Sequence, residues 1–259
     1  MRFPLRLTAE LAKAKMVGMG PGSVKRPIIF RVAVPADAGE ESSTSPSTNS
    51  ATDEEILKQV QASGAPIVWI GGTGEPLAYS GVGHLTRRIA DLGLTVFVET
   101  DGVLLRRKIF SFRPVPRIFL TVQLNGIESY HDRHAGQMGT YRAAIEGIRA
   151  ARLSGFMICA KTTVFEDTDL PDISELKRSI DSLALDGWMV TLGAGVSEGA
   201  SLGKKLEAAW NICGGRWAAF SRLVKAAEEI RPVPLPMSAG NAVGEGAREG
   251  AYEQEVRVP

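Results

Sequence analysis

The stretch APIVWIGGTGEPLAYSG, residues 65–81, runs from apolar residues of strand character straight into a glycine-rich turn. A buried strand needs only one glycine to turn, whereas here three glycines within residues 71–74 precede a single carboxylate, Glu75, which Pro76 follows. Glycines at a strand end let backbone carbonyls approach a ligand closely, and a carboxylate attracts an ammonium group. The stretch therefore predicts either a tight strand-to-helix turn or a turn that binds an ammonium ligand.

Six apolar runs of this kind alternate with helical patterns along the chain. The runs are rich in Val, Ile, Phe and Thr, and they cover residues 27–34, 66–71, 94–100, 117–124, 156–165 and 187–192. The helical patterns between them cover residues 53–63, 81–92, 103–112, 140–154 and 173–185. This alternation predicts parallel strands with right-handed crossovers, either in a doubly wound sheet or in a full or partial β/α barrel. In both architectures ligands bind beyond the carboxyl ends of the strands, where the glycine-rich turn lies.

Three segments fall outside the alternation. Residues 1–20 have helical spacing with Leu7 and Leu11 on one face, which predicts either packing against the barrel or contact with a membrane surface. Residues 35–52 have almost no apolar side chains, so we expect a mobile loop there. The end of the chain is rich in Gly, Pro, Ala and Glu, which predicts a flexible tail. The predicted organisation is an N-terminal helical segment (1–26), a barrel (27–200), a C-terminal helical segment (201–231) and the tail (232–259).

Composition and charge bound the class of protein. The chain has 259 residues, of which 30 are basic and 29 acidic, so net charge gives no argument for a nucleic-acid partner. No apolar run approaches the roughly 18 residues that cross a bilayer, and the first residues lack the apolar core of a signal peptide. The two cysteines, Cys159 and Cys213, fit a reducing compartment. We therefore expect a cytoplasmic protein, either free or peripheral to the membrane through residues 1–20.

A second polar cluster lies in LNGIESYHDRHAGQMGTY, residues 124–141. It contains His131, Asp132 and His134, which allow a metal site or a helix-entry loop organised by Asp132 and Arg133. The loop is favoured, because no third histidine lies nearby to complete a ligand set.

Together these motifs resemble the radical S-adenosylmethionine (SAM) superfamily. The sequences GGTGEP (71–76), ETDG (99–102) and QLNG (123–126), followed by YHDRHAGQMGTYRAAIEGI (130–148), look like the family's GGEP, TNG and LDG–HDR motifs. The match runs from about residue 5 to about residue 195. It implies an α/β fold, a partial (β/α)6 TIM-like barrel of the radical SAM type.

Other segments carry a narrower resemblance, to the hopanoid-biosynthesis enzymes that attach an adenosyl group to a hopene. These segments are AELAKAKMVG (9–18), KRPIIFRV (25–32), GAPIVWIGG (64–72), AARLSGFMICAKTTVF (150–165) and DGWMVTLGAG (186–195). The resemblance implies an isoprenoid substrate, and it leads us to expect a cysteine-bearing C-terminal region, which the sequence does not reach.

The superfamily resemblance also implies a SAM site at the strand ends. It places at the SAM amino group the turn residues Gly71, Gly72, Gly74, Glu75 and Pro76. It places around the rest of the cofactor Thr100, Gln123, Asn125, Lys161 and Thr163.

One expected feature is missing from the sequence. The family holds a [4Fe–4S] cluster through a CxxxCxxC loop after the first strand, whereas here the loop reads PADAGEESSTSPSTNSATDEEI (35–56) and has no cysteine. Two smaller departures agree with this: Thr73 is inserted into the GGEP turn, and Asn125 stands where the family has aspartate. No metal-binding residues are therefore assigned.

Three functions follow as hypotheses. The leading one is a catalytically degenerate superfamily member that keeps SAM or lipid binding, or that acts as the partner of an active radical SAM paralogue. The second is an active adenosyltransferase on a hopene, with its cluster held unconventionally. The third is a cluster-free β/α-barrel enzyme whose acid–base residues are drawn from Glu75, Glu99, Asp101, Lys161 and Glu198.

Overall fold

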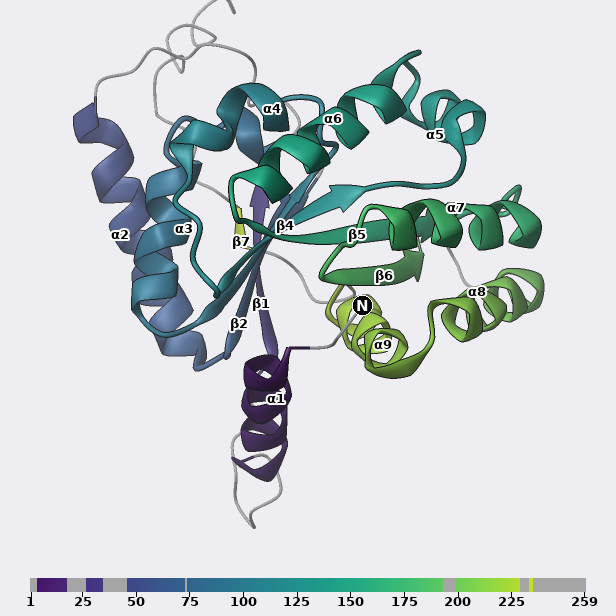
Figure 1. The fold of residues 1–259 in the computed structure, drawn as a ribbon. Helices are drawn as coiled ribbons and strands as arrows, with labels where there is room; N and C mark the ends of the chain where they lie inside the picture. Colours follow the sequence, from purple (N-terminus) through teal and green to yellow (C-terminus); the bar gives the residue numbers. More distant parts are fainter. Residues whose placement is uncertain are drawn as a thin grey trace, which may run out of the picture.

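The computed structural model describes residues 4–17, 27–34, 46–72, 74–192, 199–228 and 233–234. Its strands form one strongly curved, parallel sheet in the order β6-β5-β4-β3-β2-β1-β7 (Figure 1). The six main strands are β1 (Ile29–Val34), β2 (Ile67–Gly72), β3 (Thr95–Thr100), β4 (Ile118–Gln123), β5 (Met157–Val164) and β6 (Gly187–Leu192). Because each strand pairs with the next along the chain and the order never reverses, the predicted partial barrel is confirmed and the doubly wound sheet is excluded.

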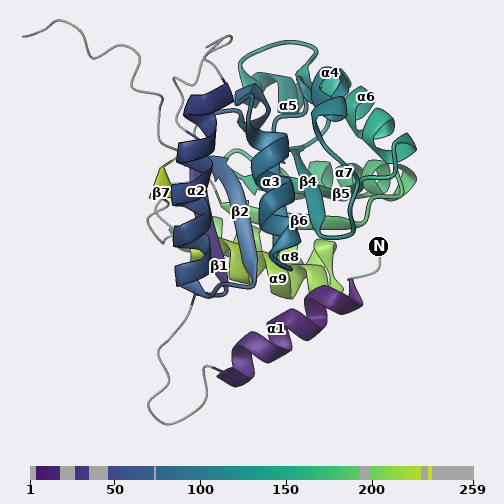
Figure 2. The same ribbon diagram turned by 90° about the vertical axis from the view of Figure 1, so that its left-hand side faces the viewer.

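Helices cover the convex side of the sheet (Figures 1 and 2). They are α2 (Pro46–Ser63), α3 (Val82–Asp91), α4 (Leu105–Lys108), α6 (Thr140–Leu153), α7 (Leu170–Ser182) and α8 (Ala200–Cys213). Alternate strand residues, such as Val68 and Ile70 on β2 and Leu120 and Val122 on β4, are fully buried in this layer. This is why the strands read as apolar on both parities: each also buries its other face.

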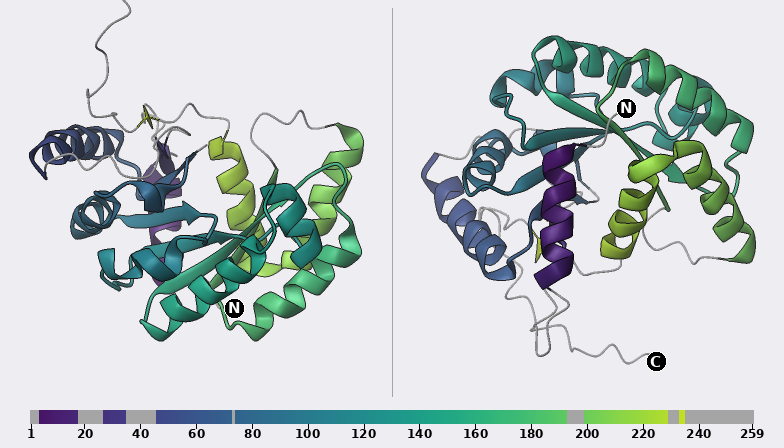
Figure 3. Two further views of the ribbon diagram at one scale, coloured as in Figure 1. Left: turned by 90° about the horizontal axis from the view of Figure 1, so that it is seen from above. Right: turned by 60° about the horizontal axis from the view of Figure 1, so that its bottom comes forward.

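The concave side carries a second core. Trp69, Phe97 and Phe119 stack across β2, β3 and β4, with ring centroids 5.2 and 4.8 Å apart. Helix α9 (Gly215–Glu228) lies against this face, and its Phe220 ring is 5.3 Å from that of Phe97 (Figure 3). Aromatic side chains therefore fill the concave side of the sheet below the carboxyl ends of the strands.

Side chains cover the β6 edge of the sheet, and a short strand extends the other end. At the β6 edge, Trp210 Nε1 donates to Val190 O at 2.8 Å, Val190 N donates to Ser221 Oγ at 3.0 Å, and Cys213 Sγ donates to Trp188 O at 3.2 Å. At the other edge, the short strand β7 (Val233–Pro234) pairs with β1. Side chains of α8 and α9 thus satisfy an edge that would otherwise expose backbone groups.

Helix α1 (Leu5–Val17) lies beneath the barrel beside α9, and Arg216 Nη1 donates to Thr8 Oγ1 at 3.1 Å (Figure 3). Leu7 is 1% exposed against the concave core. The carboxylate of Glu10 accepts hydrogen bonds from Thr95 Oγ1 and Arg117 Nη1, both at 2.7 Å. Of the two roles predicted for this helix, packing against the barrel is the one that Leu7 and Glu10 perform. None of the described helices combines the length and apolar character needed to cross a bilayer.

Two boundaries differ from those expected. Helix α2 begins at Pro46, so the second part of the predicted 35–52 loop is helical. Proline is common at the first position of a helix, so Pro46 was a signal for a helix start. The prediction of a loop relied instead on the low apolar content of the segment. Residues 35–45 lie outside the described part. Within the predicted tail, β7 forms a strand, and residues 235–259 lie outside the description.

Candidate functional site

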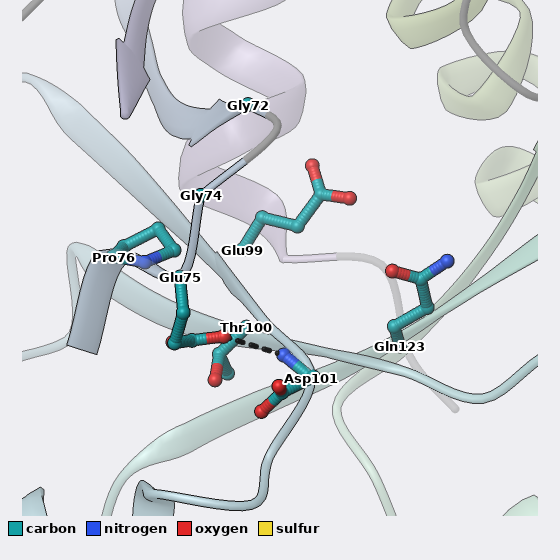
Figure 4. A pocket seen from close by; sticks show the side chains of 8 residues that line it. All are labelled: Gly72, Gly74, Glu75, Pro76, Glu99, Thr100, Asp101 and Gln123. Carbon is teal, nitrogen blue, oxygen red and sulfur yellow. Dashed lines mark hydrogen bonds between the residues drawn. The ribbon is translucent and has the colours of Figure 1, made fainter. Parts of the chain in front are cut away.

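The GGTGEP turn follows β2 and leads into the short helix η1 (Pro76–Ala78). Its carboxylate is held from two sides: Glu75 Oε1 accepts from Leu77 N at 2.9 Å, and Oε2 accepts from Asp101 N at 2.9 Å (Figure 4). The first bond caps η1, and the second ties the turn to the end of β3. Glu75 therefore shapes the site by joining two strand ends, and both of its oxygens are engaged in doing so.

The charge of Glu75 depends on pH near neutrality. Burial, with the neighbouring Asp101 carboxylate as a second cause, raises the pKa of Glu75 from 4.5 to about 7. The two backbone N–H groups act in the opposite direction but do not outweigh burial. The negative charge that the sequence predicted for an ammonium ligand is thus only about half formed at pH 7 and grows as the pH rises further.

A pocket of about 200 Å³ opens at this point (Figure 4). It is lined by Gly72, Gly74, Glu75, Pro76, Glu99, Thr100, Asp101 and Gln123. Six of these are residues predicted to contact a cofactor, and the lining includes three carboxylates. The volume lies below the roughly 300–1,000 Å³ of most small-molecule sites, so this pocket fits the charged end of a ligand rather than the whole of one.

Asn125 and Thr163, which were also predicted to lie near the cofactor, contact the pocket residue Gln123 rather than lining the pocket. Asn125 is 6% exposed, and its Oδ1 accepts from Thr163 N at 3.1 Å and from Gln123 Nε2 at 3.3 Å. Gln123 Nε2 also lies 3.3 Å from Thr163 Oγ1. Asn125 and Thr163 therefore orient the pocket residue Gln123. An amide serves this role as well as a carboxylate would, which accounts for asparagine at that position.

Lys161 lies deeper, in an ion pair with Glu99. Its Nζ is 2.8 Å from Glu99 Oε1, while Trp69 Nε1 donates to Glu99 Oε2 at 2.9 Å. Burial by itself would raise the pKa of Glu99, but the Lys161 ammonium, these hydrogen bonds and the charge of Arg31 outweigh it and hold the pKa below its usual value.

Gly71 packs directly on this pair. A Cβ at residue 71 would lie 2.9 Å from both Cβ and Oε2 of Glu99. The first glycine of the motif therefore makes room for Glu99, a residue that the resemblance did not place at the cofactor. Its signal in the sequence was position: it immediately precedes the strand-end Thr100.

The histidine-rich segment forms a helix-entry structure. His131 Nδ1 accepts from Asn125 N at 3.3 Å, and burial lowers the pKa of His131, which favours the neutral ring that can accept. Asp132 accepts three hydrogen bonds at the start of α6, from Gly139 N, Thr140 Oγ1 and Tyr141 N. Across the described ranges, no cluster of three or more His, Cys, Asp or Glu side chains could hold a metal ion. The predicted loop is helical here, because His131, Asp132 and His134 lie in α5 (Glu128–Ala135). Asp132 organises the start of α6 as predicted, whereas Arg133 Nη2 lies 3.4 Å from Asp167 Oδ2 instead.

The cysteines do not fit a [4Fe–4S] cluster. Such a cluster needs three thiolates from the chain, and the sequence supplies two cysteines. Burial raises the pKa of Cys159 well above its usual range and that of Cys213 to about 12, so both favour the thiol form. Cys159 is fully buried on β5, and Cys213 donates to a backbone carbonyl of β6. Two other predicted participants, Thr73 and Glu198, lie outside the described residues.

Comparisons with known proteins agree with this barrel. A family model described as the radical SAM superfamily matches residues 35–180. The chain is 32% identical over 153 residues to the AdoMet-dependent heme synthase of Methanosarcina barkeri, covering 56% of this chain and 43% of that protein. It is 24% identical over 124 residues to the Fe-coproporphyrin III synthase of the same organism, covering 47% and 31%. The chain spans less than half the length of these curated relatives, and neither is a hopene-forming enzyme.

Solved structures show the same fold. SuiB of Streptococcus suis bound to S-adenosylmethionine superposes with a TM-score of 0.51 at 15% identity, covering 77% of this chain and 47% of that one. A second structure of SuiB gives 0.50 at 15% identity, covering 88% and 52%.

Proposed function

The chain belongs to the radical SAM superfamily, and from this premise we propose that it binds SAM, or a SAM-like amino-acid derivative, at its strand ends without carrying a [4Fe–4S] cluster. The observation that carries the proposal is an acidic pocket at the GGTGEP turn in a chain whose donor set cannot hold the cluster. The cluster supplies the electron that cleaves SAM in the family. We therefore assign this chain ligand binding and no radical step.

The chemistry of the pocket supports a cationic ligand. Glu75, Glu99 and Asp101 all line one small pocket, and Gly72 and Gly74 present backbone without side chains. An amino-acid end with its ammonium group suits these features in charge and in size. Gln123, held by two neighbours, adds a fixed amide at the opposite wall.

The filled interior disfavours a large apolar substrate. Phe220 of α9 lies against the ring of Phe97, and Trp217 packs so closely on Gly187 that a Cβ there would come within 2.2 Å of its ring. Ring contacts this close leave no room between them for a hopene or a porphyrin. We therefore do not extend the hopene-forming activity to this chain. Because the chain spans less than half the length of its haem-synthesising relatives, we do not extend their activities to it either.

Isothermal titration calorimetry of SAM into the purified protein tests the proposal. SAM loses the anchoring contacts that a cluster gives it, so we expect a dissociation constant between about 10 μM and 1 mM, or roughly −7 to −4 kcal/mol. Glu75→Gln should abolish binding because its amide N–H would face a backbone N–H, whereas the matched surface change Glu146→Gln should leave binding intact. Absence of heat at millimolar SAM would contradict the proposal and point instead to a protein partner.

A further inference from the structure

We propose that Glu99, backed by Trp69, is a cation subsite at the floor of the strand-end pocket, and that Lys161 is an internal occupant which the positive charge of the ligand displaces. The inference rests on the proposed function, because it names the group that recognises the ligand. Its chemical class is an organic cation, which in SAM is either the ammonium or the sulfonium group.

The position of the ion pair is the first argument. Glu99 on β3 and Lys161 on β5 reach toward each other across β4, where Thr121 pairs with Glu99 and Gln123 pairs with Lys161. Their charged atoms meet at 2.8 Å. Thr121 is fully buried on the same face of the sheet, and its hydroxyl has no hydrogen-bond partner among the described residues. The pair thus separates the pocket above from the filled core below.

The construction around Glu99 is the second argument. Trp69 Nε1 fixes one carboxylate oxygen, and Gly71 leaves the space that the carboxylate fills. The Lys161 ammonium lies 5.7 Å from the centroid of the Trp69 ring, within the range of a cation–π contact. A carboxylate beside an aromatic face is a site for an organic cation, and here it holds one.

The other pocket carboxylates are less suited to this role. Glu75 has both oxygens bonded to backbone N–H groups. Asp101 is exposed, and its Oδ1 accepts from Val103 N at 2.8 Å. Glu99 lines the pocket with a side chain that is 15% exposed, so a ligand can reach it. Figure 4 shows its carboxylate projecting away from Glu75 and Asp101, on the side of Gln123.

If the cation of the ligand replaces the Lys161 ammonium at Glu99, the site should prefer cationic ligands to neutral ones. Lysine carries its charge on a flexible four-carbon stem, so its ammonium can withdraw while the stem stays packed. A neutral ligand that displaced it would leave the buried Glu99 carboxylate without its hydrogen-bonded cation and with only the more distant charge of Arg31, which is unfavourable. A cationic ligand restores the charge balance as it binds.

The test compares Glu99→Gln and Lys161→Met by calorimetry with three ligands. SAM carries both cations, S-adenosylhomocysteine carries the ammonium alone, and methylthioadenosine is neutral. We expect Glu99→Gln to weaken SAM by about 10- to 100-fold, as for loss of a charged hydrogen bond, and to leave methylthioadenosine unchanged. Lys161→Met removes the competing cation and should tighten SAM binding. S-adenosylhomocysteine identifies the group: equal weakening by Glu99→Gln indicates the ammonium, and no weakening indicates the sulfonium.

The inference predicts that Glu99→Gln weakens SAM binding and that Lys161→Met tightens it, and these opposite effects are the test. A purely structural ion pair predicts that both substitutions weaken SAM, and that result overturns the inference, as does an equal change for all three ligands. The double variant Glu99→Gln with Lys161→Met buries no unpaired charge, and it should bind SAM no better than Glu99→Gln does. Unfolding curves for each variant separate loss of fold from loss of recognition. If the unchanged protein binds none of the ligands, the proposed function fails as well; if it binds SAM and the variants behave alike, only this inference fails.

Discussion

At the scale of single residues, two glutamates at neighbouring strand ends have opposite electrostatics. Glu75 has neutral partners, two backbone N–H groups and the Thr100 hydroxyl, and a nearby carboxylate, so burial dominates and raises its pKa to about 7. Glu99 is more deeply enclosed, yet its pKa is lowered because Lys161 and Trp69 bond to its carboxylate. The partner, more than the depth of burial, sets the charge of each group.

The raised pKa of Glu75 predicts a pH-dependent stability. The folded protein holds this proton more tightly than the unfolded chain, so the contribution is complete below about pH 4.5 and is lost as pH rises through about 7. We expect this residue to lower the free energy of unfolding by roughly 1–3 kcal/mol between pH 5 and pH 8. Urea unfolding of the natural protein and of Glu75→Gln measures it. Equal pH slopes for the two proteins would refute the assignment.

Adding one methyl group at Gly71 should lower the stability of the protein through a local clash with Glu99. Gly71→Ala places a Cβ 2.9 Å from the Glu99 carboxylate, which must move and loosen its bonds to Trp69 and Lys161. We expect a loss of about 2–4 kcal/mol in the free energy of unfolding, from overpacking and a weakened buried pair. Gly199→Ala is the matched control, because no atom lies within 4 Å of its added Cβ. A loss as small as that of the control would show that Glu99 is free to shift.

At the scale of elements, helices α8 and α9 supply hydrogen bonds to the edge strand β6 that a neighbouring strand would otherwise supply. Their side chains bond to the backbone of β6, and α9 also fills the concave face with aromatic rings. The same pair of helices therefore ends the sheet and limits the size of any ligand in the barrel. Helix α1 closes the lower end through Leu7 and Glu10.

Substitution of Ser221 tests whether α9 satisfies the backbone of the edge strand β6. Its Oγ accepts from Val190 N at 3.0 Å, and the residue is fully buried. Ser221→Ala leaves that N–H without a partner, so we expect a loss of about 1–3 kcal/mol in the free energy of unfolding. Hydrogen exchange at the Val190 amide should accelerate, whereas exchange at Phe97, in the middle of the sheet, should change only with global stability. Unchanged protection of Val190 would mean that another group satisfies the edge.

At the scale of the whole molecule, the barrel belongs to the radical SAM superfamily, and we have proposed that this chain binds its ligand without a [4Fe–4S] cluster. The sequence has two cysteines, Cys159 buried and Cys213 half-buried, and burial raises the pKa of both thiols, whereas a [4Fe–4S] cluster of this family needs three thiolates. We predict that anaerobic treatment with iron and sulfide leaves no cluster on the desalted protein, as measured by bound iron and by visible absorption. Replacing both cysteines with serine should not alter the bound iron. A stable four-iron cluster on the natural protein would contradict both the prediction and the proposed function.

Much of the fold was predictable from the sequence, because strand and helix periodicities are local. Six apolar runs separated by helical patterns predicted parallel strands with right-handed crossovers, and the resemblance to the radical SAM superfamily implied the partial barrel. GGTGEP marked the strand end at which the pocket lies. The start of α2 was missed because its first turns are polar. In the site, the motif residues were predictable one by one, but their roles were not: Glu75 acts through backbone N–H groups that belong to two separate turns.

The sequence alone determined the alternation of strands and helices, the strand end at which the glycine-rich turn lies and the number of cysteines, since each depends on residue type and local spacing. Tertiary structure alone decided which carboxylate is paired, which is engaged by the backbone, and how much of the barrel is filled. Glu99 and Lys161 are 62 positions apart, and Phe97 of β3 and Phe220 of α9 lie far apart in the sequence. Pairings of that kind arise only when the curved sheet brings distant strands and α9 together, because charge compensation and burial are properties of the assembled interior.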